Sequence, residues 1–94
     1  MYLLKIEHKV MNYEGWKKAF DSDPAGREKS GVRQYRIMRG IEDRDYIVIE
    51  LEFDTYSQAE SLLAAMRAVW VNVEGKIMVR PNTLISEIVE FRKY

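Results

Sequence analysis

The spacing of hydrophobic residues along this 94-residue chain changes several times, and the changes predict six elements. Apolar and polar residues alternate over Tyr2–Val10, which is the period-two pattern of a half-buried strand. Similar alternation returns in three later segments: Val32–Arg39, Tyr46–Phe53 and Leu84–Phe91. The polar turn between the second and third of these strands predicts a hairpin.

A first helix is predicted directly after the first strand. Asn12 is a suitable N-cap, because its side-chain oxygen can accept a hydrogen bond from an amide of the first turn. Three aromatic residues then share one helical face: Tyr13, Trp16 and Phe20. Asp23–Pro24 predicts that a helix starts afresh there after a kink, and Gly31 is expected to end it.

A second helix is predicted between the third and fourth strands. Thr55–Gln58 matches a capping box, in which the first and fourth residues cap each other's backbone amides. The apolar stripe of this helix follows at helical spacing: Ala59, Leu62, Leu63, Met66, Trp70 and Val73. Gly75 is expected to end the helix. The apolar stretch Ile77–Pro81 is expected to close at its proline.

The element order is strand, helix, strand, strand, helix, strand. It predicts a single α+β domain, residues 1–94, of the ferredoxin-like βαββαβ kind, with a four-stranded antiparallel sheet and both helices on one face. The residues expected on the helix-covered face are Leu4, Ile6, His8, Tyr35, Ile37, Ile47, Ile49, Leu51, Phe53, Ile85, Val89 and Phe91.

The opposite face of this sheet is expected to mix apolar and charged side chains. Its members are Leu3, Lys5, Glu7, Val32, Gln34, Arg36, Met38, Tyr46, Val48, Glu50, Leu84, Ser86 and Ile88. This face is too apolar for open water and too charged for a dry core. A chain of this length also buries a modest share of its surface, so the sequence predicts a homodimer that covers the face.

Composition excludes several function classes. Fifteen Lys and Arg balance fifteen Asp and Glu, so the basic excess needed for nucleic acid is lacking. The chain has no cysteine and a single histidine, so we expect neither a zinc or non-haem iron site nor a cofactor. Apolar runs stay well below the ~20 residues of a membrane span, and charges interrupt the N-terminus. A cytoplasmic location without a membrane partner is therefore expected.

His8 is the candidate for chemistry. It points into the apolar face of the first strand, where an imidazole that titrates near neutrality can act as a base. The alternative is a structural histidine held by one hydrogen bond. Glu87 interrupts the apolar face of the neighbouring fourth strand, so it either approaches His8 and raises its pKa or marks an exposed strand edge.

A cluster of large side chains is the candidate binding site. Five residues from helices and sheet are expected to line an apolar cavity for a small hydrophobic or aromatic ligand: Trp16, Phe20, Tyr35, Met66 and Trp70. Plain core packing is the alternative, because aromatic residues at helical spacing usually fill cores. A cavity of about 300 Å³ or more beside His8 favours the ligand-binding interpretation.

Three stretches resemble the dimeric α+β-barrel superfamily, and most closely small uncharacterised proteins near the antibiotic-biosynthesis monooxygenases: HKVMNYEGWKKAFDSD, GVRQYRIMRG and YIVIELEFDTYSQAE. The resemblance covers most of the chain. It implies a homodimer whose two sheets close a barrel, with a ligand between sheet and helices. Haem-degrading members carry a histidine after the second helix. This chain has none there, so haem is not expected.

Three functional hypotheses follow. The first is a homodimeric barrel protein that binds or modifies a small hydrophobic or aromatic molecule. The second is a cofactor-independent monooxygenase acting on a phenolic or polyketide-like substrate, with His8 as the base. The third is a structural or interaction module whose aromatic cluster is only a core.

Overall fold

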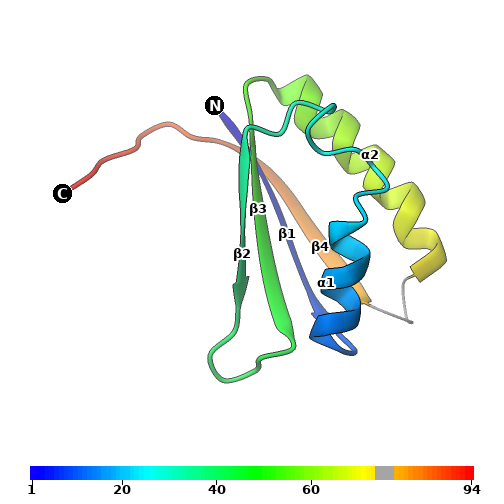
Figure 1. The fold of residues 1–94 in the computed structure, drawn as a ribbon. Coiled ribbons are helices and arrows are strands. Elements are labelled where there is room, and N and C mark those ends of the chain that lie inside the picture. Colours follow the sequence, from blue (N-terminus) through cyan, green and yellow to red (C-terminus); the bar gives the residue numbers. More distant parts are fainter. Residues whose placement is uncertain (74–77) are drawn as a thin grey trace.

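The computed structural model describes residues 1–73 and 78–94. Its elements are β1 (Tyr2–Val10), α1 (Tyr13–Asp21), β2 (Gln34–Arg39), β3 (Tyr46–Phe53), α2 (Tyr56–Val73) and β4 (Met78–Glu87). The strands pair antiparallel in the order β2-β3-β1-β4, and both helices cover one face of the sheet (Figure 1). The predicted ferredoxin-like α+β fold is confirmed.

The register of the sheet places the alternating apolar residues in rows beneath the helices. Leu4 of β1 pairs with Leu51 of β3, and Ile6 pairs with Ile49. The largest fully buried side chains are Phe53, Leu4, Ile6, Ile47, Leu51 and Leu62. The core therefore lies between the two central strands and α2, and it supports the aromatic residues of α1.

Both helix starts are as predicted. The Asn12 side chain accepts a hydrogen bond from the Gly15 amide at 2.8 Å. In the capping box, the backbone N–H of Gln58 donates to Thr55 Oγ1 at 3.1 Å, and the backbone N–H of Thr55 donates to Gln58 Oε1 at 3.2 Å. These signals are local in sequence, so each fixes its helix start without help from tertiary packing.

The predicted second helical start at Asp23–Pro24 is wrong. The helix α1 ends at Asp21, and turns occupy the segment that follows. Asp23 has a φ of 52° and caps a turn, since its carboxylate accepts the Arg27 amide at 2.9 Å. Gly26 has a φ of 70°, which breaks any continuing helix. Gly31, with a φ of 97°, ends this turn segment and not a helix.

The fourth strand lies further towards the N-terminus than predicted. It starts at Met78 and passes through Pro81, which was expected to close the apolar stretch. Proline is tolerated here because β4 is an edge strand and because the β1–β4 register shifts beside it. The strand ends at Glu87 because its partner β1 begins at Tyr2, and Glu87 is already opposite Tyr2.

Three residues lie in different parts of the structure from those predicted. Val89 and Phe91 were expected in the core, but they lie beyond β4 and are 88% and 80% exposed. They belong to a tail, residues 88–94, that runs away from the body of the molecule (Figure 1). Val32 was expected on the outer face, but it precedes β2 and packs against the core.

Part of the predicted helix end lies outside the described residues. This applies to Gly75, to Ile77 and to the Val73 side chain. Within residues 1–73 and 78–94, no helix is long and apolar enough to cross a membrane.

Candidate functional site

An apolar cavity of about 210 Å³ lies between the sheet and the two helices. We call it the aromatic cavity. Its lining comes from β1, α1, the turns after α1, β3, α2 and β4: Ile6, Trp16, Ala19, Phe20, Ser22, Asp23, Pro24, Ala25, Arg27, Ile49, Met66, Val69, Trp70 and Met78. Four of the five predicted ligand-binding residues thus meet around one space. They are Trp16, Phe20, Met66 and Trp70.

The predicted site residue Tyr35 has a different position. It lies on β2, and its ring packs at a tilt of 44° against that of Phe20, with 5.3 Å between ring centroids. It is not among the residues that line the aromatic cavity. Tyr35 therefore supports the wall from behind, whereas Phe20 and Trp16, with ring centroids 5.2 Å apart, form the wall itself.

Arg27 also lines the aromatic cavity, and no motif in the sequence singles it out. Its guanidinium carbon lies 3.8 Å from the centre of the Phe20 ring and 5.1 Å from that of Tyr35. Arg27 Nη1 also donates to the Phe20 carbonyl at 2.8 Å and lies 3.4 Å from an Asp23 carboxylate oxygen. These contacts fix the turns after α1 over the cavity.

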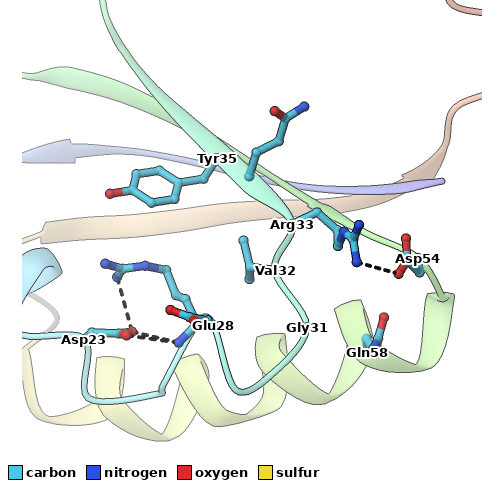
Figure 2. A pocket seen from close by; sticks show the side chains of 10 residues that line it. Asp23, Glu28, Gly31, Val32, Arg33, Tyr35, Asp54 and Gln58 are labelled. Atoms are coloured by element: carbon cyan, nitrogen blue, oxygen red, sulfur yellow. Dashed lines mark hydrogen bonds and ion pairs between the residues drawn. The ribbon is translucent and has the colours of Figure 1, made fainter.

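A second hollow of about 850 Å³ adjoins the first (Figure 2). Its lining joins the turn segment with the start of β2 and with α2: Asp23, Arg27, Glu28, Gly31, Val32, Arg33, Gln34, Tyr35, Asp54 and Gln58. Half of these ten residues are charged, compared with two of the fourteen around the aromatic cavity. Asp23 and Arg27 line both hollows, so they form the boundary between an apolar and a polar compartment.

His8 lies beside the aromatic cavity and is buried, with 2% of its surface exposed. Its ring meets that of Trp16 edge-on, with centroids 5.9 Å apart. Its side chain does not line the cavity. Trp16 therefore contacts both the imidazole and the space where a ligand would lie. The cavity is also smaller than the roughly 300 Å³ expected beside His8.

The hydrogen bond of His8 determines its tautomer. Nδ1 lies 3.2 Å from the Lys9 carbonyl oxygen, which can only accept, so Nδ1 carries the proton. Nε2 is then the nitrogen with a free lone pair. Burial lowers the pKa of His8 below its usual 6.5, and the Lys9 hydrogen bond opposes this only in part. The ring is therefore neutral at physiological pH.

We expect acid to destabilise the fold through His8. Above pH 6.5 the imidazole is neutral in both the folded and the unfolded chain. Below that pH the unfolded chain binds a proton that the buried ring resists, so the free energy of unfolding falls until the pH reaches the lowered pKa of the folded state. Urea unfolding between about pH 8 and pH 5.5 measures this slope. His8→Asn should flatten it, and an equal slope in the variant would contradict the assignment.

Glu87 does not approach His8. It pairs with Tyr2 at the other end of β1, and Tyr2 Oη donates to its carboxylate at 3.3 Å. Of the two alternatives for Glu87, the approach to His8 is therefore excluded, and exposure at a strand end explains its position. Among the described residues, no group of three His, Asp or Glu side chains is placed to hold a metal ion.

No protein-family model and no curated protein matches the sequence. Solved structures do match the fold. One is described as a candidate antibiotic biosynthesis monooxygenase from Nitrosomonas europaea. It is 18% identical over 96% of this chain and 100% of its own, with a TM-score of 0.69.

Two further solved structures share the fold. A variant of SnoaB, a cofactor-independent oxygenase from Streptomyces nogalater, has a TM-score of 0.77 and 9% identity over 96% of this chain and 94% of its own. A dimeric ferredoxin-like protein from an uncultured marine organism has a TM-score of 0.72 and 11% identity over 99% of this chain and 92% of its own. The recognised fold is thus that of ferredoxin-like proteins resembling the antibiotic biosynthesis monooxygenases.

Proposed function

We propose that this protein is a homodimer in which each subunit binds a small aromatic molecule in the aromatic cavity. The observation that carries the proposal is the convergence of Trp16, Phe20, Met66 and Trp70 on one apolar space that they do not fill. A plain core at native density leaves few voids larger than a water molecule. The cytoplasm remains the expected location.

The volume and chemistry of the cavity define the ligand. A dry apolar cavity of about 150 Å³ is enough to hold benzene. The 210 Å³ cavity therefore suits one aromatic ring with a substituent, and it is too small for several fused rings. Asp23 and Arg27 are its charged lining residues, and Ser22 adds a hydroxyl. A phenol fits this arrangement, because its ring is apolar and its hydroxyl can both donate to Asp23 and accept from Arg27.

The homodimer follows from the outer face of the sheet. Leu84 on β4 is 56% exposed, and Met38 on β2 is 37% exposed. Val48 and Leu3 lie between them on the central strands, beside the charged pair Lys5–Glu7. The tail of residues 88–94 adds Val89 and Phe91, whose apolar side chains are largely exposed on their own subunit. A second copy would cover both surfaces, as the dimeric form of one fold relative also suggests.

Calorimetric titration with phenol and naphthol tests ligand binding. We expect saturable binding of phenol at one site per subunit. Ala19→Leu places a larger side chain in the cavity from α1, and the overlap should weaken binding about 10- to 100-fold. Ala65→Leu makes the same change on the exposed side of α2 and is the matched control. Equal affinities of the two variants would contradict the proposal.

A second candidate function is oxidation of the bound phenol by O₂ to a quinone and water, without a cofactor. Its support is the position of a neutral His8 with a free Nε2 lone pair beside Trp16, together with the fold shared with a cofactor-independent oxygenase. In this proposal the phenol turns its hydroxyl away from Asp23 and Arg27 and towards Trp16 and His8, where Nε2 takes the phenolic proton. Quinone absorbance in air measures turnover. His8→Ala should abolish it, whereas turnover unchanged in the variant would reject the base.

A further inference from the structure

A third hollow, distinct from the two described above, lies between α2 and β4. It has a volume of about 450 Å³ and is lined by Arg67, Trp70, Val71, Arg80, Pro81 and Thr83. We call it the basic groove. Trp70 lines both the basic groove and the aromatic cavity, so its indole forms part of the partition between two chemically different spaces.

Among the described residues that line the basic groove, all charge is of one sign. Arg67 and Arg80 are its charged lining residues, and none of the six is acidic. The salt bridges recorded within residues 1–73 and 78–94 are formed by other cations: Lys5, Lys9, Lys17, Arg27, Arg33 and Arg36. Two guanidinium groups therefore border one hollow to which the described chain contributes no carboxylate. This arrangement attracts an anion.

Arg80 is held at the groove by an unusual backbone conformation. The β1–β4 ladder pairs Lys9 with Val79 and Glu7 with Asn82, so Arg80 and Pro81 together face one residue of β1. Bulges of this kind redirect a side chain. Arg80 has a φ of 46°, in the left-handed region where its Cβ is crowded and where glycine has no such cost. An arginine at this position therefore carries backbone strain.

Arg67 is held by a hydrogen bond across the groove. Its Nη2 donates to Thr83 Oγ1 at 3.2 Å. The Thr83 hydroxyl accepts in this bond, so its own proton remains available to donate. Arg67, Thr83 and Arg80 therefore supply three donors around one space that Trp70 also lines.

We propose that the basic groove binds a small aromatic oxyanion, a phosphate ester or carboxylate whose ring lies against Trp70. Arginine forks match the paired oxygens of both anions, and the contact is stronger than a hydrogen bond between neutral groups. Threonine adds a hydroxyl donor. The indole offers a ring face to the aromatic part of the ligand. The negative group of such a ligand would contact the two arginines and Thr83, and its ring would contact Trp70.

Calorimetric titration with phenyl phosphate, benzoate and inorganic phosphate tests this site. We expect phenyl phosphate or benzoate to bind more tightly than inorganic phosphate, because only they reach Trp70. Arg80→Gln and Arg67→Gln should each weaken binding about tenfold or more, as expected for one lost charge-assisted contact. Arg92→Gln removes a charge from the tail and should leave the affinity unchanged. The tighter of the two aromatic anions identifies the natural head group as phosphate or carboxylate.

Arg80→Gly separates binding from structure. Glycine relieves the crowding at a φ of 46°, so this variant should unfold at a higher urea concentration than the parent while losing anion affinity. The NMR signal of the Trp70 indole N–H should shift on titration of the parent and stay fixed in the variant. Absence of saturable binding by the parent, or full affinity in Arg80→Gly, would overturn the proposal.

Discussion

Phe53→Ala should lower the free energy of unfolding by about 3–5 kcal/mol, one of the two largest effects that we expect. Phe53 is 0% exposed and belongs to the central core, where its removal leaves a hole that the rigid β-sheet cannot collapse to fill. Urea unfolding followed by circular dichroism measures the change. A loss below about 1 kcal/mol would show that the core is not packed around this ring.

Trp16→Ala provides the comparison that separates core from cavity. Trp16 is buried but borders the aromatic cavity, so the part of its ring that faces the cavity makes no packing contacts. Truncation to alanine therefore removes fewer contacts than it would in a filled core. We expect a cost at or below the lower end of the range for Phe53→Ala, about 3 kcal/mol, together with the loss of phenol binding. A cost equal to that of Phe53→Ala with phenol affinity retained would favour a purely structural aromatic cluster.

Val48→Asp should give the second large effect, conversion of the dimer to monomers. Val48 lies on the central strand β3, opposite Met38 of β2 and Glu7 of β1 on the outer face. A buried, unpaired carboxylate at an interface centre should cost about 2 kcal/mol or more, which is a roughly 30-fold weaker dimer. Analytical ultracentrifugation at tens of micromolar measures the dissociation constant.

Two further variants make the dimer test specific. Leu84→Asp places the same charge on the outer face of β4 and should act in the same direction. Ile41→Asp changes a residue that is 86% exposed in the β2–β3 turn, outside the outer face, and should leave the dimer intact. Circular dichroism must show folded protein in each case. A parent protein that sediments as a monomer would reject the proposed homodimer.

Features encoded by adjacent residues were predictable from the sequence. The Asn12 cap and the Thr55–Gln58 capping box require only a few neighbouring residues, and both formed as predicted. The alternation within β1 and β3 correctly placed their buried residues, because one face of β3 is apolar throughout and His8 is the one polar side chain on the buried face of β1. The convergence of the predicted aromatic residues follows from these two successes, since the helix faces and the sheet face determine it.

Features that depend on distant contacts were not predictable. Pro81 reads locally as the end of an apolar stretch, but it is accommodated because β4 is an edge strand with a register shift. The extent of β4 depends on where its partner β1 starts. Arg27 is one arginine among many in the sequence, and its position between Phe20 and Tyr35 arises only when the turns fold back onto α1 and β2.

Bound phenol should lie in the aromatic cavity, and NMR spectroscopy can locate it there. NMR spectra of protein with labelled methionine methyl groups report contacts between the phenol ring and Met66 or Met78, which line the cavity from α2 and β4. We predict cross-peaks from the ring to both methyl groups and to the Trp70 indole, lost in Ala19→Leu. Saturating phenol without these contacts, or with contacts only to Met38 on the outer face, would contradict the account.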